Sequence, residues 1–287
     1  MTASNDPRAR RGRTAAGIVA VAVALAGLAV LAATTAAAAT GPVGATVGPR
    51  PLRVMVAGNS VAGTLARGSP LADELHGIAA LPGLEVSDRI ILACGISSLP
   101  EVVLSSGPAP NSCGGTGHWQ QQWPVDLAEV RPDVVLVGAG DHDVYDEITA
   151  DGTLVPQGSA AWRAQYSTDV AQMFSVLRAT GASVVAISPG CYGQDTLDPT
   201  DPPIAQRSDP QRVQAVQAVW REQATRRRGV HFLDLDATIC PAGVADPALR
   251  PDGVHFSQAG ADRLAPVVAR ALDDAVRLDH RQVSPRG

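Results

Sequence analysis

Short runs of apolar, mostly β-branched residues recur along the chain in a pattern typical of an alternating α/β protein. Five of these runs predict strands, at residues 52–58, 86–93, 133–140, 182–189 and 230–236. Apolar residues return at helical spacing over residues 160–180, 210–227 and 257–278. Because the strand segments are continuously apolar, we predict a parallel sheet covered on both faces. The expected fold is a three-layer α/β/α sandwich of the flavodoxin-like type.

In a sheet of this kind, the functional loops lie at the carboxyl ends of the strands. Two long stretches rich in Pro, Gly and Ser, residues 105–117 and 190–208, are predicted to be surface loops that shape a binding cleft.

The first forty residues have the pattern of an export signal. Four arginines between residues 8 and 13 precede an uncharged apolar run that extends to about residue 40. The run is long enough, at roughly 20 residues, to cross a bilayer, but small residues at 36–39 also offer sites for a signal peptidase. A cleaved signal peptide and an uncleaved anchor both stay open, and either places the rest of the chain outside the cytoplasm.

The predicted organisation therefore has four parts. Residues 1–40 form the signal peptide or membrane anchor, and residues 41–51 form a flexible linker rich in Gly, Pro, Ala and Thr. Residues 52–279 form the folded domain, and residues 280–287 form a tail.

Composition narrows the possible partners. The chain has 287 residues, of which 45% are hydrophobic, so it is long enough to bury a substantial core. Its net charge is -5 and its basic clusters are short, which argues against nucleic-acid binding. We expect contact with a membrane only through the N-terminal segment.

Four cysteines, Cys94, Cys113, Cys191 and Cys240, follow the export signal. An even number of cysteines in an exported chain predicts disulfides. Three connectivities are possible, and we favour Cys94 with Cys113 and Cys191 with Cys240. Their spacing fits no compact zinc motif, so we predict neither a metal site nor a cofactor.

The first predicted strand runs directly into Gly58-Asn59-Ser60. A serine at a strand-to-helix turn exposes its hydroxyl above the sheet, and the N–H groups of the helix start help to stabilise an oxyanion. Serine is also a common helix cap, so this tripeptide by itself does not establish catalysis.

A second candidate segment lies near the C-terminus, where Asp252 precedes His255 by three residues just ahead of a predicted helix. One turn can present both side chains. The carboxylate then accepts a hydrogen bond from one ring nitrogen of His255, and the other nitrogen takes the proton of Ser60. The alternative is that Asp252 caps a turn and His255 is merely half-buried.

Other candidates are weaker. Asp141, His142 and Asp143 have suitable types for metal ligands together with Asp252 and His255, but they alternate faces at a strand end and leave Ser60 without a role. No Gly-x-Ser-x-Gly motif is present, which argues against the α/β-hydrolase fold.

Two tryptophans, Trp119 and Trp123, follow Cys113 in what we take to be a loop. Stacking on a sugar ring is one interpretation, and anchoring the loop in the core is the one we favour.

The segments around Ser60 and around Asp252 and His255 resemble blocks I and V of the SGNH (GDSL-like) hydrolase family, and the resemblance extends over about residues 52–275. More narrowly, the chain resembles the SGNH domains that are fused to, or work with, membrane acyltransferases that O-acetylate cell-surface sugars. The supporting segments are Cys94-Gly95 and residues 131–146, 187–193, 240–243 and 250–265, of which the last is the most specific.

This resemblance implies roles for individual residues. Ser60, Asp252 and His255 match the catalytic residues, and Gly95 matches the block II glycine whose N–H stabilises the oxyanion together with that of Ser60.

The chain departs from the family pattern at two places. Block III commonly supplies an oxyanion donor from the asparagine of Gly-x-Asn-Asp, whereas residues 138–143 read Gly-Ala-Gly-Asp-His-Asp. The third donor is therefore unassigned, with the N–H of Gly140 or the side chain of His142 as hypotheses. In block I, Asn59 replaces the aspartate, a change that we expect to be tolerated because an amide keeps similar hydrogen bonds.

The expected function is that of an exported serine esterase or acyl-transfer enzyme that acts on O-acyl (acetyl) esters of cell-surface carbohydrate or on small esters. One alternative is an O-acetyltransferase domain that completes a transfer begun by a separate membrane acyltransferase. The other is a catalytically degenerate SGNH domain that only binds carbohydrate. The expected location is outside the cytoplasm, either secreted or anchored to the outer face of the cytoplasmic membrane.

Overall fold

Five parallel strands form the central sheet of the computed structural model. The structure describes residues 50–68, 74–114, 118–188, 190–193, 205–240 and 245–283, which belong to one unit, Gly48–Gly287. The sheet order is β2-β1-β5-β8-β9. The strands are β1 (Leu52–Gly58), β2 (Leu84–Ile90), β5 (Val134–Gly138), β8 (Ser183–Ile187) and β9 (Val230–Leu233). The predicted parallel sheet is confirmed.

The apolar strand sequences explain the position of the core. Residues 54–57 of β1 and 134–137 of β5 are completely buried, so side chains on both faces of these strands are covered. Burying each Val, Leu or Ile side chain contributes about 1.5–3 kcal/mol, which makes the centre of the sheet a rigid base for the loops at its carboxyl edge.

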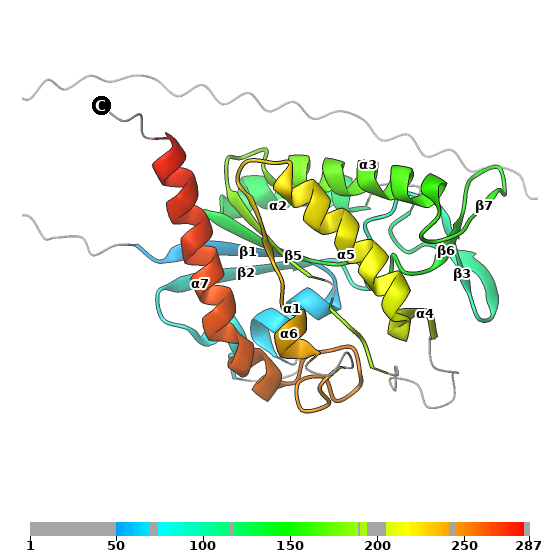
Figure 1. The fold of residues 1–287 in the computed structure, drawn as a ribbon. Coiled ribbons are helices and arrows are strands. Elements are labelled where there is room, and N and C mark those ends of the chain that lie inside the picture. The colour runs from blue at the N-terminus through cyan, green and yellow to red at the C-terminus, as the bar shows by residue number, and fades with distance from the viewer. Residues whose placement is uncertain are drawn as a thin grey trace, which may run out of the picture. The chain divides into compact units, whose positions relative to one another are not determined.

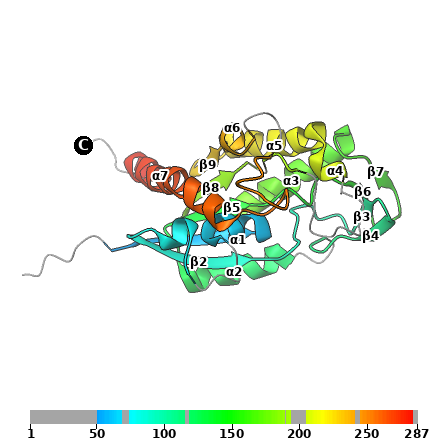
Figure 2. The ribbon, with the colours of Figure 1, turned by 90° about the horizontal axis from the view of Figure 1, so that it is seen from below.

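Helices cover both faces of the sheet, which confirms the predicted three layers. One group packs together and comprises α1 (Ser60–Arg67), η1 (Gly77–Ala80) and α7 (Gln258–Val283). The other packs in series and comprises α2 (His118–Val130), α3 (Ala160–Leu177) and α5 (Pro210–Thr225). Figure 1 shows α3 above the strands and α1 below them. Seen from below, α2 lies near the β2 edge, and α5 lies near the β9 edge with the short helix α6 (Asp236–Ile239) (Figure 2).

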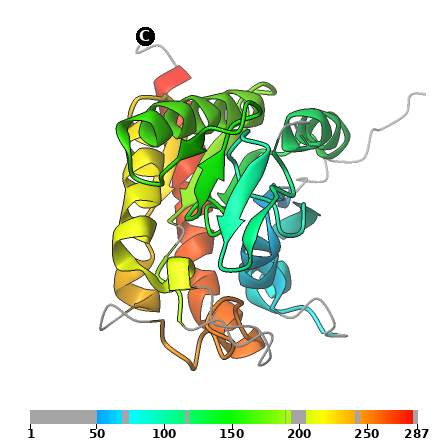
Figure 3. The ribbon, with the colours of Figure 1, turned by 90° about the vertical axis from the view of Figure 1, so that its right-hand side faces the viewer.

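A second, smaller sheet was not predicted. Its order is β4-β3-β6-β7 and all its pairs are antiparallel. It lies at the right of Figure 1 and faces the viewer in Figure 3. Its strands are β3 (Glu101–Leu104), β4 (Gly107–Pro110), β6 (Asp146–Ile148) and β7 (Leu154–Val155). Strands this short carry too few residues to display a period in the sequence.

Several predicted boundaries need correction. The predicted strand 86–93 is displaced, since β2 ends at Ile90, and the backbone turns at Ala93 with φ 55°. The predicted loop 105–117 contains β4, and the predicted loop 190–208 contains the helix α4 (Ala205–Ser208). The last helix runs to Val283 rather than to residue 278.

The two tryptophans lie in α2 and not in a loop. Trp119 and Trp123 are completely buried and their ring centroids are 5.6 Å apart. Rings without exposed surface are unable to stack on a sugar. The sugar-stacking interpretation is therefore wrong, and the core interpretation is confirmed.

Two disulfides join Cys94 with Cys113 and Cys191 with Cys240, as we favoured. Disulfides of this kind indicate an oxidising, extracytoplasmic environment. The predicted signal or anchor, residues 1–40, and residues 41–49 of the linker lie outside the described residues. In the described part of the chain, no helix combines the length and the apolar character needed to cross a membrane.

Candidate active site

The tight turn between β1 and α1 presents Ser60 at the carboxyl edge of the sheet. Gly58 has φ 119°, and a Cβ at this position would lie 1.8 Å from the carbonyl oxygen of Gly138 on β5. Only glycine fits there. Asn59 then caps α1, because its side-chain oxygen accepts a hydrogen bond from the N–H of Val61 at 3.1 Å. Ser60 is therefore the first residue of the helix.

Ser60, His255 and Asp252 lie in one row of hydrogen bonds. His255 Nε2 is 2.8 Å from Ser60 Oγ, and His255 Nδ1 is 2.8 Å from Asp252 Oδ2. In the tautomer that donates Nδ1–H to the carboxylate, Nε2 is left to accept the serine proton. The side chains of His255 and Asp252 are 24% and 23% exposed, so a substrate can reach the row.

The Asp-x-x-His turn is held by its own backbone. Asp252 Oδ1 accepts hydrogen bonds from the N–H of Val254 at 2.8 Å and of His255 at 2.7 Å. The next N–H, of Phe256, donates to Thr64 Oγ1 on α1 at 3.2 Å. The turn is thereby fixed against the helix that carries Ser60.

Hydrogen bonds also set the charge of Asp252. Partial burial pushes the pKa of its carboxyl group upward, but the His255 ring and the N–H groups of Val254 and His255 outweigh that effect and lower the pKa below its ordinary value. Asp252 is therefore a carboxylate at neutral pH, as the orientation of His255 requires.

A buried arginine supports the same turn from behind. Arg250 is 2% exposed, its guanidinium donates to the carbonyl of Cys191 at 2.8 Å, and it lies 4.3 Å from the ring of Phe256 and 5.0 Å from that of Tyr192. Because Cys191 is bonded to Cys240, this second disulfide holds the loop on which Arg250 rests.

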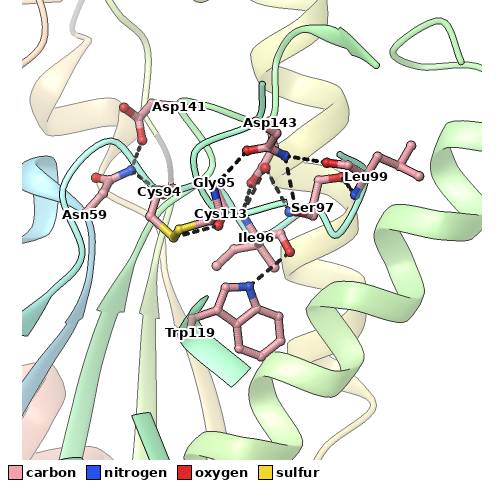
Figure 4. The surroundings of a disulfide bond; sticks show 11 residues. Asn59, Cys94, Gly95, Ile96, Ser97, Leu99, Cys113, Trp119, Asp141 and Asp143 are labelled. Carbon is pink, nitrogen blue, oxygen red and sulfur yellow. Dashed lines mark hydrogen bonds between the residues drawn. A yellow bond between two sulfur atoms is a disulfide. The ribbon is translucent and has the colours of Figure 1, made fainter. Parts of the chain in front are cut away.

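The block I departure, Asn59, lies in contact with Asp141, which matches the aspartate of the block III pattern. Asn59 is completely buried, and its Nδ2 donates both to the carbonyl of Cys94 at 3.1 Å and to Asp141 Oδ1 (Figure 4). An aspartate at position 59 has no donor for either acceptor and would face a second carboxylate. Asn59 therefore supplies two hydrogen bonds that an aspartate would lack, and the expectation that the change is tolerated stays a prediction.

Asp141 is a buried carboxylate whose charge has several partners. Burial pushes its pKa upward, but the charges of His142 and Arg207 and the hydrogen bond from Asn59 bring the pKa below its ordinary value. Arg207 NH2 is 3.8 Å from Asp141 Oδ2 and 3.0 Å from the Nε2 of His142.

The predicted oxyanion donors Gly95 and Gly140 are each next in the chain to a residue that Asn59 contacts. No described residue accepts a hydrogen bond from the N–H of Gly95 or of Gly140. Gly95 follows Cys94 in the loop that Asn59 contacts, and Gly140 lies in the turn after β5 with φ 111°. Their participation in catalysis stays a prediction.

The Asp141-His142-Asp143 segment does not form a metal centre in the described residues, where no group of three His, Cys, Asp or Glu side chains is arranged to hold an ion. Asp141 and His142 share Arg207 as a partner, whereas Asp143 accepts hydrogen bonds from Ile96, Ser97 and Tyr166. Sequence reasoning considered Asp141 and Asp143 only as metal ligands and so missed their contacts with the active-site loops. Their position just after a buried strand was the available signal.

The sequence profile of the GDSL-like Lipase/Acylhydrolase family matches residues 97–263, more than half of the chain. The matched segment contains Asp252 and His255 and begins after Ser60 and Gly95. A search of curated proteins finds no significant match.

Solved structures with the same fold include acylhydrolase-like proteins from two Bacteroides species. A proposed acylhydrolase from Bacteroides fragilis is 15% identical with a TM-score of 0.54, over 80% of this chain and 92% of the other. A GDSL-like lipase from Bacteroides thetaiotaomicron is 17% identical with a TM-score of 0.52, over 78% of this chain and 88% of the other. The chain therefore belongs to the GDSL-like lipase/acylhydrolase family and is an SGNH-type hydrolase.

Proposed function

We propose that the protein is an exported serine esterase or acyl-transfer enzyme in which Ser60 is the nucleophile, His255 the general base and then acid, and Asp252 the residue that orients His255. The observation that carries this proposal is the row of two 2.8 Å contacts from Ser60 Oγ through the imidazole to Asp252. The three groups are already at hydrogen-bonding distance, so proton transfer needs no rearrangement of the protein.

In the first half of the reaction, His255 Nε2 takes the proton of Ser60 as Oγ attacks the ester carbonyl carbon. The N–H groups of Gly95 and Ser60 stabilise the oxyanion of the tetrahedral intermediate. His255 then returns the proton to the leaving alkoxide, and the acyl group stays on Ser60. In the second half, His255 deprotonates water or a sugar hydroxyl, which attacks the carbonyl carbon of the acyl-enzyme. The bond to Ser60 Oγ then breaks, His255 returns the proton to Oγ, and the acid or a new ester is released.

Gly140 is the proposed third oxyanion donor. Its N–H has no acceptor among the described residues, and it stands in the turn where the family carries its asparagine. A lost oxyanion donor typically costs about 100- to 1000-fold in rate, so a backbone replacement at this place would preserve most of the activity.

The proposed substrates are O-acyl esters, acetyl esters above all, of cell-surface carbohydrate. The resemblance of residues 250–265 to SGNH domains that work with membrane acyltransferases supports this class. A cleft of about 220 Å³ that is lined by four apolar residues and by five polar residues is a candidate site for the sugar. Its polar residues are Asn111, Ser112, His142, Tyr145 and Arg207.

The proposed location is outside the cytoplasm, with the N-terminal segment either removed or kept as an anchor. The disulfides support export, and the arginine-flanked apolar run supports the route. A separate membrane acyltransferase is the proposed partner if the acceptor is a sugar. An intact-mass measurement on the exported protein distinguishes the cleaved from the anchored form.

Labelling with a fluorophosphonate tests the nucleophile. We expect the purified domain to be labelled and to hydrolyse a short-chain aryl ester, and Ser60→Ala to lose both while keeping its melting temperature. Ser175→Ala is the matched control, because Ser175 lies on α3 and its hydroxyl contacts only the carbonyl of Ala171. A wild-type domain without labelling and without hydrolysis would overturn the enzyme and favour the carbohydrate-binding alternative. Acylation of an added oligosaccharide in preference to water separates transferase from esterase.

A further inference from the structure

Asp143 is a buried carboxylate that holds the loop of Gly95. It is completely buried, and its Oδ1 accepts the N–H of Ile96 at 2.9 Å and of Ser97 at 3.1 Å. Figure 4 shows the carboxylate facing these two backbone groups next to Gly95. A Cβ at position 95 would lie 2.3 Å from Asp143 Oδ1, so the carboxylate fills the place that any other residue would need.

The contacts on the two sides of Gly95 have a common effect. A peptide unit is planar, so the carbonyl of Cys94 and the N–H of Gly95 turn together, and the carbonyl of Gly95 turns with the N–H of Ile96. Asn59 holds the first plane through the Cys94 carbonyl at 3.1 Å, and Asp143 holds the second through the Ile96 N–H. Glycine has wide freedom in φ and ψ, so without these two contacts the Gly95 N–H would sample many directions.

The carboxylate is itself fixed from rigid elements. Tyr166 on α3 donates its hydroxyl to Asp143 Oδ2 at 2.8 Å, and Trp220 on α5 donates its indole N–H to the Tyr166 oxygen at 2.7 Å. Both aromatic residues are completely buried. Two long helices therefore support the orientation of a single backbone N–H at the active site.

We propose that Asp143 is a positioning residue for ester cleavage. Asp143 fixes the peptide plane that follows Gly95, and Asn59 fixes the plane that precedes it. Together these contacts direct the Gly95 N–H toward the oxyanion. This inference rests on the proposed function, since it takes Gly95 as an oxyanion donor. A displacement of about 1 Å in a catalytic group can cost 100-fold in rate, so a loosened loop lowers kcat without removing any group from the site.

The surroundings of Asp143 make its proposed effect on kcat depend on pH. Burial raises the pKa of its carboxyl group to about 6 against the lowering effect of the Ile96, Ser97 and Tyr166 donors, and the charge of Asp141 adds to the rise. Glu147 on β6 is a further carboxyl group that faces Asp143. Protonation of Asp143 below about pH 6 weakens its hold on the two N–H groups, so kcat falls on the acid side.

The test compares Asp143→Asn with Asp169→Asn in the full chain, with an aryl ester as substrate from pH 5 to pH 9. Asp169 is the matched control, because it is also buried and accepts the N–H of Ser98 in the same loop at 3.0 Å, but farther from Gly95. We expect D143N to lower kcat and the rate of fluorophosphonate labelling by roughly 10- to 100-fold with KM changed less than about threefold. D169N should keep kcat within about threefold of wild type.

Tyr166→Phe tests the same role without touching the charge, in case D143N folds poorly. Loss of one donor raises the pKa of Asp143 further, so the acid limb of kcat should move to higher pH while kcat at pH 9 stays near that of the wild type. An active wild type with D143N unchanged in kcat, or with Y166F unchanged in its pH profile, overturns this inference alone. A wild type that is neither labelled nor active overturns the proposed function and this role with it.

Discussion

The side-chain amide of Asn59 donates to the carboxylate of Asp141, and both groups are almost completely buried. The block I position that carries aspartate in the family pattern thus holds the amide, and the carboxylate is in the block III turn. The two side chains are complementary, because the Asn59 amide donates and the Asp141 carboxylate accepts.

Exchanging the two residues tests this complementarity. Asn59→Asp places two buried carboxylates in contact and removes the donor to Cys94, so we expect a loss of about 3–5 kcal/mol in the free energy of unfolding at pH 8. The loss should shrink as the pH falls toward 5, because a protonated carboxyl group is a donor again. Urea unfolding of N59D and of the double variant N59D/D141N measures the effect, and we expect the exchange to restore part of the stability. No recovery in the double variant would mean that the contact is incidental.

Asp252→Asn should disable the enzyme without unfolding it. An amide no longer selects the His255 tautomer that leaves Nε2 free to accept, so we expect kcat to fall by roughly 1000- to 10,000-fold. KM and the melting temperature should change little, since the amide oxygen still accepts the N–H groups of Val254 and His255. Steady-state kinetics with an aryl ester, beside circular dichroism, make the comparison. Retention of more than about a tenth of kcat would remove Asp252 from the mechanism.

Glu147 should make the protein less stable in alkali. Burial raises the pKa of its carboxyl group to about 8, opposed by the nearby hydroxyl of Ser97 and aided by the charges of Asp143, Asp169 and Asp146. The folded pKa is above the unfolded one, so the folded state binds the proton more tightly, and stability is lost as the pH rises from about 4.5 through 8.

Glu147→Gln removes this titration. We expect E147Q to match the wild type near pH 5 and to exceed it by several kcal/mol at pH 9, on the order of 1.4 kcal/mol for each unit of pKa difference. Urea unfolding at both pH values measures the difference. Glu101→Gln on the exposed side of β3 is the control and should follow the wild type. Identical pH dependence in E147Q and the wild type would show that Glu147 is not the group responsible.

The two disulfides should differ in what their removal does. Cys94 immediately precedes Gly95, so we expect Cys94→Ser with Cys113→Ser to lower kcat more than Cys191→Ser with Cys240→Ser. The second disulfide closes the longer segment, with a sequence separation of 49 against 19, so its loss should cost about 1 kcal/mol more stability by the chain-entropy argument. Activity and melting temperature of the two double variants test both parts, and the reverse ranking in kcat would contradict the first.

The central sheet was predictable because its strands are continuously apolar, which is a local property of the sequence. Ser60, Asp252 and His255 were found from their spacing and resemblance, and the structure brings them together. The smaller sheet was missed because pairs such as Val102 with Glu147 join short segments far apart in the chain. For the same reason, no pattern showed that Asp143 accepts hydrogen bonds from the Gly95 loop.

The contact between Ser60 and His255 joins residues that are 195 positions apart in the chain. Thr64 and Phe256 repeat that connection one turn later, where α1 packs against α7. We expect contacts of such long range to form late in folding, because closing so long a loop costs conformational entropy before the contact stabilises it. We therefore expect hydrolysis to return during refolding no earlier than the docking of α1 against the His255 turn. Enzymatic activity would then be a stricter measure of complete folding than helix content.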